Sequence, residues 1–286
     1  MFEVKNNIFE MEIMMSVRII IDSASDLTKE QADKLGLDFL PLKTIFGTEE
    51  YLDGITLNHQ QFYEKLIESD CMPTTSQIPP HDFEQLYADV KEKKDTAVVI
   101  TLSSRLSGTF QSANIALDGY EDCITIVDSE NVCLGEQILV MYACRLRDAG
   151  ASASEIAKAL DQKKKDVRVL ALLDTLEYLK KGGRIGRLAG TVGEFLNLKP
   201  IITTDENGIY YNVAKVRGRK QSLSKMTELL KGYLEKGKCE VAVLHAGCED
   251  EAIKYMNSLK DLPNIVSIKI AEISPALGVH GGPGLI

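Results

Sequence analysis

The sequence predicts an α/β protein of two packed α/β lobes, the N-terminal one with a mainly parallel sheet and the C-terminal one with a mixed sheet. Two observations carry this prediction. Short β-branched apolar runs alternate with helical patterns along most of the 286 residues, which is typical of parallel strands joined by helical crossovers. No Pro- or Ser-rich linker divides the chain. We expect an N-terminal extension over 1–15, an N-terminal lobe over 16–166 and a C-terminal lobe over 167–286.

The N-terminal lobe begins with Val17–Asp22, an apolar run of β-branched residues. Thr28 and Gln31 fit a capping box, and Gly36 is placed to end the helix that this box begins. The remaining apolar runs predict strands at 39–46, 97–102 and 124–128. The intervening patterns predict helices at 59–69, 81–94, 109–117, 134–149 and 154–165.

The C-terminal lobe starts with an expected strand at 167–173. Asn207-Gly208 lies between two β-branched runs, 200–204 and 209–213, and therefore predicts a hairpin. Further strands are expected at 241–244 and 266–273, and helices at 176–180, 222–236 and 249–259.

Composition excludes several classes of protein. The net charge of −9 argues against a free-standing nucleic-acid binder, because phosphate contacts require a basic surplus. No apolar run reaches the ~18 residues that a membrane span needs. The first 16 residues lack the three regions of a signal peptide, and none of the six cysteines forms a C-x-x-C pair. We therefore expect a cytoplasmic protein with reduced thiols.

Two hydroxyl-rich loops are the first candidates for a site. Leu102–Thr109 follows an expected strand and precedes a helix, where open α/β sheets bind ligands. Gly108 allows close backbone approach, and the helix start favours an anion. Pro73–Pro80 carries more hydroxyls between prolines that restrict it. The alternatives are an ordinary helix cap for the first loop and a structural connector for the second.

Neither loop matches a phosphate loop, a dinucleotide fingerprint or an esterase elbow. Hydroxyls and backbone N–H groups suit one carboxylate better than a triphosphate, which normally calls for a lysine and a metal. His245, Cys248 and Glu249 are passable metal ligands, but one short cluster is weak evidence for zinc. We expect no metal and no cofactor.

Two basic segments and one glycine-rich segment offer further groups. Lys180–Arg187 is suited to clamping an anion or to ending a helix. Lys215–Lys220 is either a solvated loop or a docking patch for an acidic or phosphate-bearing partner. His280 lies among the glycines of 276–284, where the imidazole can donate to an anion.

The ordered motifs of this chain resemble those of the DegV family. The resemblance runs from about residue 17 to the end, and the combination of motifs is specific. Its motifs are Asp22-Ser23-Ala24-Ser25-Asp26-Leu27, Thr75-Ser76-Gln77, Leu102–Ala113, Val127-Asp128-Ser129, Lys181-Gly182-Gly183-Arg184-Ile185 and His280-Gly281-Gly282-Pro283-Gly284.

The resemblance implies a protein that binds one long-chain fatty acid such as palmitate, stearate or oleate. It implies a non-catalytic subunit that presents the carboxylate to a separate ATP-binding fatty acid kinase subunit in a bacterium. The acyl-phosphate product then feeds phospholipid synthesis. The expected partners are the fatty acid and this kinase, with no nucleic acid and with room for transient contact with a membrane surface.

Site residues carry over motif by motif. Thr75 and Ser107 correspond to hydroxyls that hold the carboxyl group, and His280 corresponds to a histidine at the same head group. Arg184 corresponds to an arginine near the head group that matters for the phosphorylated state or the kinase encounter. Ser76 and Gly108 complete the expected ligand-binding set, and Arg217 and Arg219 form the expected partner-binding set. The chain departs from the family pattern at Ile78, before the prolines, and at Gly281, after the histidine.

Two other functions remain open at this point. One is a stand-alone hydrolase or phosphotransferase that uses Ser107 or His280; such an enzyme would turn over an ester or acyl-phosphate alone. The other is a regulatory lipid-sensing protein, suggested by the basic stretch Lys215–Lys220.

Overall fold

A parallel sheet forms the N-terminal part of the molecule. The computed structural model describes residues 16–69, 71–188 and 198–286, so the expected N-terminal extension, 1–15, lies outside the described residues. The strands run in the order β2-β1-β6-β7, and every neighbouring pair is parallel. They are β1 (Val17–Asp22), β2 (Asp38–Leu40), β6 (Thr96–Thr101) and β7 (Ile124–Asp128). The expected α/β class with an N-terminal parallel sheet is confirmed.

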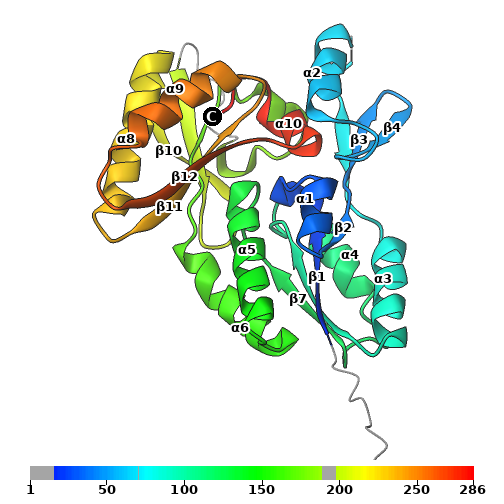
Figure 1. Cartoon of the computed structure of the whole chain (residues 1–286). Helices are drawn as coiled ribbons and strands as arrows, with labels where there is room; N and C mark the ends of the chain where they lie inside the picture. The colour runs from blue at the N-terminus through cyan, green and yellow to red at the C-terminus, as the bar shows by residue number, and fades with distance from the viewer. Residues whose placement is uncertain (1–15, 70, 189–197) are drawn as a thin grey trace, which may run out of the picture.

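Helices cover both faces of this sheet (Figure 1). Alternate strand residues point to opposite faces: Ile20 and Val99 pack under one helix layer, whereas Ile19 and Val98 pack under the other. The first layer holds α3 (Pro80–Glu92) and α4 (Thr109–Ile115), and the second holds α1 (Lys29–Lys34), α5 (Leu134–Asp148) and α6 (Ala153–Lys163). Capping boxes begin α1, as predicted, and also α6 and the helix His59–Glu68, which is α2.

A small antiparallel sheet with one helix stands beside the parallel sheet (Figure 1). Its strands are β3 (Lys43–Phe46), β4 (Glu49–Leu52) and β5 (Thr74–Ser76), and its helix is α2 (His59–Glu68). The single strand expected at 39–46 is thus divided between β2 and β3. The polar loop expected at 73–80 is in part a strand, because β5 pairs with β3.

The C-terminal part contains both antiparallel and parallel pairing, in two separate hydrogen-bonded sheets. One holds β8 (Ala171–Leu172), β9 (Leu198–Thr204) and β10 (Tyr210–Arg217), and the other β11 (Cys239–His245) and β12 (Ile265–Glu272). The predicted β9–β10 hairpin is confirmed, whereas only two residues of the strand expected at 167–173 are paired. The helices are α7 (Glu177–Lys181), α8 (Arg219–Leu234), α9 (Glu249–Leu259) and α10 (Pro275–Gly281).

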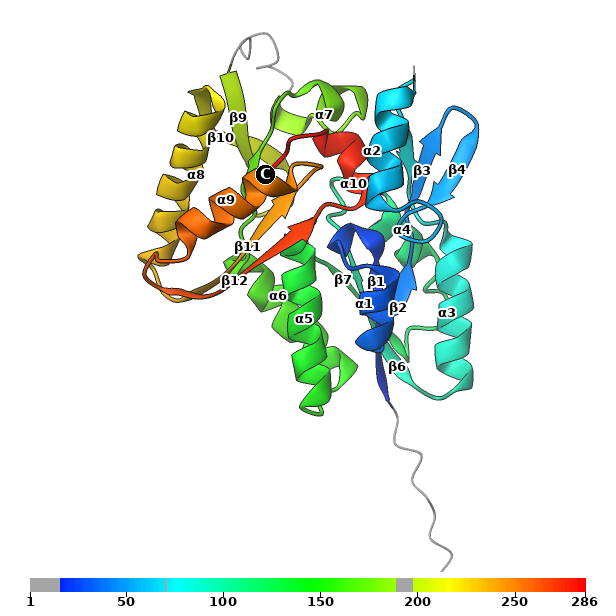
Figure 2. The same cartoon turned by 45° about the horizontal axis from the view of Figure 1, so that its top comes forward.

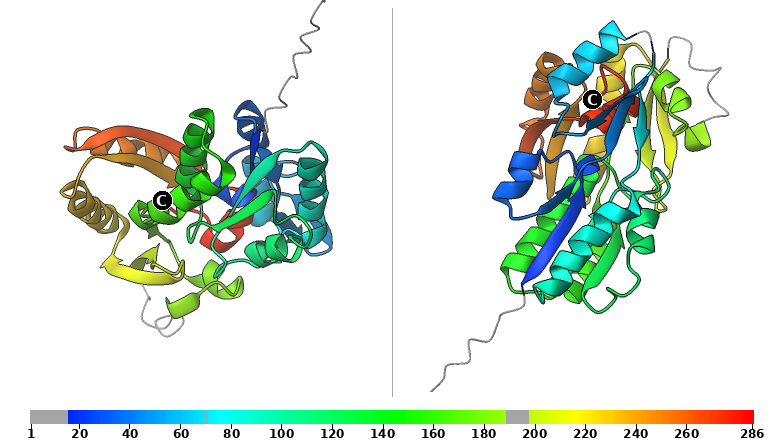
Figure 3. Two further views of the ribbon diagram at one scale, coloured as in Figure 1. Left: turned by 90° about the horizontal axis from the view of Figure 1, so that it is seen from below. Right: turned by 90° about the vertical axis from the view of Figure 1, so that its right-hand side faces the viewer.

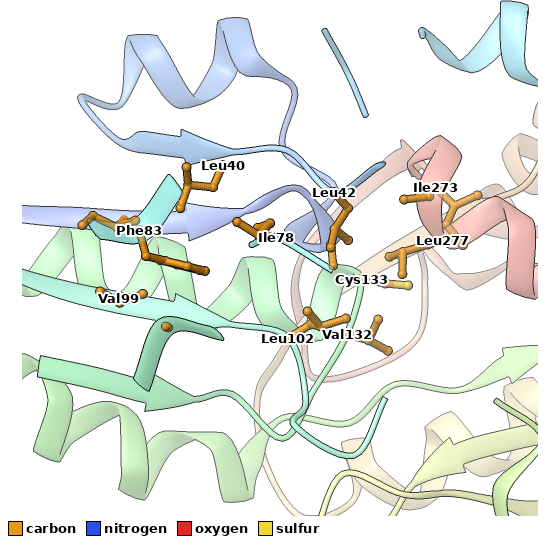
Figure 4. Close-up of a cluster of buried hydrophobic side chains, with 14 of the residues drawn as sticks. Leu40, Leu42, Ile78, Phe83, Val99, Leu102, Val132, Cys133, Ile273 and Leu277 are labelled. Atoms are coloured by element: carbon orange, nitrogen blue, oxygen red, sulfur yellow. The ribbon is translucent and has the colours of Figure 1, made fainter. Parts of the chain in front are cut away.

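The last helix connects these parts. Figure 2 shows α10 next to α2, and Figure 3 shows the C-terminal elements, in yellow to red, beside the N-terminal ones. Apolar side chains from distant segments meet near α10: Figure 4 places Leu42 close to Leu277 and Cys133, with Leu102 facing Val132. Within the described ranges, no helix is long and apolar enough to cross a membrane.

Candidate functional site

The loop after β6 is held by buried polar contacts at its start. The Leu102 N–H donates to Oδ2 of Asp22 (2.9 Å), and the Ala24 N–H donates to Oδ1 of the same carboxyl (2.9 Å). Burial raises the pKa of Asp22 to about 7. Ser103 is buried and donates its hydroxyl to the Gly208 carbonyl in the β9–β10 hairpin (3.1 Å). Residues of the N-terminal part and of the C-terminal part therefore both fix this loop.

Ser107 occupies the helix end of that loop. Its Oγ accepts from the Thr109 N–H (3.2 Å) and lies 2.9 Å from Oγ1 of Thr109. Helix α4 has Gly108 as its N-cap and no side-chain capping hydrogen bond, so the Ser107 contact belongs to the turn before the helix and the expected alternative of an ordinary helix cap is not found. Ser107 also lines the large cavity described below.

Thr75 and His280 meet although 205 residues separate them: Oγ1 of Thr75 lies 2.8 Å from Nε2 of His280. Thr75 lies on β5, opposite Thr44 of β3, whereas His280 is in the last turn of α10. The glycine-rich segment around His280 is mainly helix. The sheet and the helix together bring a hydroxyl and an imidazole to one place.

The His280 imidazole is neutral at neutral pH. Burial, together with the nearby Arg184 guanidinium, lowers the pKa of His280 to about 4. Its Nδ1 edge lies against α7, where a Cβ built at Gly182 would be 2.2 Å away. A neutral imidazole offers one N–H donor and one acceptor, and so can bind an anion without forming an ion pair.

Arg184 joins the turn after α7 to the hydroxyl loop. Its Nε donates to the Leu106 carbonyl (3.1 Å), and its Nη1 donates to the Gly182 carbonyl (2.8 Å). Arg184 thus sits next to both Ser107 and His280, which places a fixed positive charge at the same end of the cavity.

Gly108 has a different neighbour from the one predicted. A Cβ at Gly108 would lie 1.9 Å from Oε1 of Gln77, so the close approach is by a side chain of the other loop. Gln77 also donates to Oγ of Ser112 (2.8 Å) and thereby joins the two hydroxyl loops. Gly108 itself is not among the residues that line the cavity.

One cavity of about 1000 Å³ runs through the molecule. Thr75, Ser76, Ser107, Arg184 and His280 all line it, so the structure brings five of the six predicted ligand-binding residues to one cavity. This is the upper part of the range for small-molecule sites, about 300–1,000 Å³.

The cavity is elongated and mainly apolar. It follows one face of α5 from Cys133 to Arg145, and twelve residues of helix rise about 18 Å. It also follows β11 from Cys239 to Leu244. Its walls include Leu42, Leu102, Val132, Ile138, Val243, Ile273 and Leu277.

Basic side chains surround the cavity where α5 ends and β11 begins. Arg145 lies there in an ion pair with Glu240 (3.5 Å). The other charged residues that line this region are Lys163, Lys165, Asp166, Arg168, Lys236 and Lys238. Cations outnumber anions here although the whole chain carries −9.

The remaining candidates lie elsewhere. Arg217 is exposed at the end of β10, whereas Arg219 pairs with Glu251 (2.8 Å) and Asp174 (3.5 Å). Neither arginine lines the cavity. Around His245, as in the rest of the described ranges, no group of three or more acidic, Cys or His side chains is placed to hold a metal.

Sequence reasoning missed three residues of the site. Gln77 and Gly182 were visible only as members of motifs, and their contacts cross from one segment to another. Tyr210 lines the cavity from the β9–β10 hairpin, and nothing in its local sequence indicates this. The Asn207-Gly208 pair predicts the hairpin turn, but it does not indicate that Tyr210 faces the cavity.

The family model described as "Uncharacterised protein, DegV family" matches residues 16–286. The chain belongs to the DegV family. A DegV domain-containing protein of Clostridium acetobutylicum is 36% identical over 276 residues, which cover 96% of this chain and 98% of the relative.

Solved DegV structures share the fold along nearly the whole chain. A DegV family protein from Thermus thermophilus, described by its fatty acid binding, superposes with a TM-score of 0.87 at 29% identity, covering 95% of this chain and 97% of that one. DegV of Bacillus subtilis, described as a fatty acid binding protein, gives 0.85 at 33% identity, with the same coverage.

Proposed function

We propose that this DegV protein binds one long-chain fatty acid, such as palmitate, stearate or oleate. The observation that carries the proposal is a mainly apolar cavity that follows about 18 Å of α5 and brings Thr75, Ser107 and His280 together in its lining. A bilayer core of ~30 Å holds two acyl chains end to end, so one chain needs about 15 Å. The fatty acid binding described for the Thermus and Bacillus relatives supports the same ligand.

Hydroxyls and a neutral imidazole suit a buried carboxylate. Thr75, Ser107 and His280 offer hydrogen bonds without a fully desolvated ion pair, whose burial is costly. Arg184 adds one positive charge beside them, and Ser76 lines the same region. The acyl tail contributes about 0.8 kcal/mol per buried CH₂, so the apolar walls supply most of the affinity.

The protein then presents the carboxylate to a separate ATP-binding kinase subunit in the bacterial cytoplasm, and acyl-phosphate enters phospholipid synthesis. A non-catalytic role is supported by the surroundings of His280, because in the described ranges no carboxylate is hydrogen-bonded to its ring to orient it as a base. Exposed Arg217 is the proposed kinase contact. Arg219 supports that contact through its ion pairs with Glu251 and Asp174.

Mass spectrometry of lipid extracted from the purified chain tests the proposal. The expected result is one fatty acid per chain, or stoichiometric uptake of added stearate, palmitate or oleate. A chain that carries no fatty acid and takes up none of the three is not a fatty-acid-binding protein.

Two alanine variants test the head-group residues. Thr75→Ala and Ser107→Ala each remove a hydrogen bond to the fatty acid carboxylate. We therefore expect each to weaken stearate binding about tenfold. Ser104→Ala is the matched control, since exposed Ser104 is in the same loop but does not line the cavity. Wild-type affinity in both variants would rule out this head-group assignment.

Charge reversal tests the kinase contact. Arg217→Glu should reduce acyl-phosphate formation with the kinase and ATP while stearate affinity stays unchanged, because Arg217 is exposed and away from the cavity. Loss of stearate binding instead would place this segment at the lipid site.

A further inference from the structure

The helix that carries His280 does not cap its own amino end. Helix α10 has seven residues, and its N-cap Ser274 makes no side-chain capping hydrogen bond. The first N–H groups of a helix have no partner within it, so buried ones require an acceptor from elsewhere. Pro275 has no N–H, but the N–H groups of buried Ser274 and Ala276 need such acceptors.

Two carboxyls from the N-terminal part supply these acceptors. Oδ1 of Asp26 accepts from the Ser274 N–H (2.8 Å), and Oδ1 of Asp53 accepts from the Ala276 N–H (3.2 Å). These bonds span 248 and 223 residues of sequence. Both carboxyls are buried, Asp53 with 0% exposure, so water does not compete for the bonds.

Asp53 belongs to the same structural unit as Thr75. It follows β4, and its N–H donates to the Leu42 carbonyl just before β3 (2.9 Å). Strand β3 pairs on its other side with β5, which carries Thr75. One small sheet therefore carries Thr75 on an edge strand, β5. Asp53, which follows the other edge strand, β4, accepts a hydrogen bond from the helix that carries His280.

Side-chain packing keeps α10 in this place. A Cβ at Gly278 would lie 2.7 Å from the Phe62 ring of α2, so the helix rests directly on that ring. Burial raises the pKa of Asp26 to about 8 and of Asp53 to about 6, and the hydrogen bonds from the Ser274 and Ala276 N–H groups oppose this rise. The contacts at the amino end of α10 thus fix its position and, with it, the His280 ring.

We infer that Asp53 and Asp26 are positioning residues of the carboxylate site, which hold α10 so that His280 meets Thr75. This inference rests on the proposed fatty-acid function for its purpose, and on the hydrogen bonds at α10 for its geometry. Neither carboxyl lines the large cavity, so both act through His280.

The test compares Asp53→Ala with Asp53→Asn. Alanine removes the acceptor for the Ala276 N–H, whereas asparagine keeps an oxygen there. Alanine shortens the side chain beside a small cavity of about 20 Å³, so the substitution introduces no steric clash. If the alanine variant does not fold, Asp53→Ser, whose hydroxyl is too short to reach Ala276, replaces it in the same measurements.

Two readouts are followed in each variant. Imidazole ¹H–¹⁵N NMR of the lipid-free chain reports the His280 ring, which is assigned by His280→Gln because the chain has four histidines. Stearate titration reports the affinity. We expect alanine to shift the His280 signals and weaken stearate binding about tenfold, the worth of one lost hydrogen bond, and asparagine to restore both.

Asp38→Ala is the control, because Asp38 is a partly buried carboxyl of the N-terminal part whose side-chain hydrogen bonds come from Arg18 and not from α10. Its His280 signals should equal those of wild type. A folded Asp53→Ala or Asp53→Ser chain with unshifted His280 signals and wild-type affinity overturns the inference. Failure of wild type to bind stearate, palmitate or oleate refutes the proposed function instead, and the lipid-free NMR comparison still decides the positioning role.

Discussion

At the scale of single residues, the candidate site depends on glycines that leave room for its polar side chains. Gly182 adopts ordinary helical dihedrals, with φ −76°, so alanine is compatible with its backbone. The Cβ of that alanine would nevertheless lie 2.2 Å from Nδ1 and 2.8 Å from Cε1 of His280. Space for the imidazole, and not backbone freedom, is what requires glycine here.

Gly182→Ala should therefore displace the imidazole from Thr75. We expect stearate affinity to fall about tenfold or more, since one hydrogen bond to the head group is lost. Gly232→Ala is the control, because its Cβ meets nothing within 4 Å in the last turn of α8, where alanine should stabilise by at most about 1 kcal/mol. Calorimetric titration and urea unfolding measure the two effects; equal affinity in both variants would contradict the role of Gly182.

Residue chemistry was partly readable from the sequence. Hydroxyls after a predicted strand indicated Ser107, and the motif resemblance joined it to Thr75 and His280. The positions of Gln77 and Gly182 could not be read, because a contact that crosses the fold leaves no local pattern. Gly108 was expected to let the backbone approach a ligand closely. Its lack of a side chain instead leaves room for the Gln77 side chain.

At the scale of elements, the β9–β10 hairpin bridges the two parts of the molecule. Its tip residue Gly208 has φ +74°, and its carbonyl accepts from Ser103 at the base of the hydroxyl loop. A Cβ at Gly208 would lie 2.1 Å from Oγ of Ser103. The hairpin can reach the loop only because this position has no side chain.

Gly208→Ala should lower the free energy of unfolding by more than the strain of a left-handed alanine, which is about 1–2 kcal/mol. Gly150→Ala isolates that strain, because Gly150 has φ +87° and open space around its Cβ position. Urea unfolding of both variants gives the difference, which reports the Ser103 contact. Equal destabilisation of the two variants would mean that the hairpin moves away from Ser103 without a further loss of stability.

Elements with strong local signals were predicted well. The capping box at Thr28, the Asn-Gly turn and the amphipathic helix at Glu249–Leu259 all have patterns that hold without the rest of the fold. The strands β3 to β5 and helix α10 have three to seven residues, and their pairing or capping partners are remote in sequence. Such short elements are stable only through tertiary contacts, so local propensity does not reveal them.

At the scale of the whole molecule, buried carboxyls make stability depend on pH. Burial raises the pKa of Asp22 to about 7 and of Asp26 to about 8, and holds that of Glu136 well above its usual value. The folded state therefore binds more protons than the unfolded chain. Their stabilising contribution is full at low pH and is lost as the pH rises through these folded-state values.

Between pH 6.5 and pH 9 or so, the free energy of unfolding should fall by about 1–2 kcal/mol for Asp26 alone. Asp26→Asn, which cannot ionise, should flatten that part of the profile, whereas Glu68→Gln on the exposed face of α2 should leave it as in wild type. Urea unfolding across the pH series measures the slope. A wild-type slope in Asp26→Asn would show that Asp26 does not titrate in this window.

The cavity of about 1000 Å³ also belongs to the interior of the protein, since residues of both its N-terminal and C-terminal parts form the walls. If the proposed function holds, an acyl guest there would complete the packing that the side chains leave open. By mass action, a ligand at a hundred times its dissociation constant adds about 2.7 kcal/mol to the stability of its host. The lifetime of this protein in a cell would then follow the lipid supply: chains without a guest unfold more often and are degraded first.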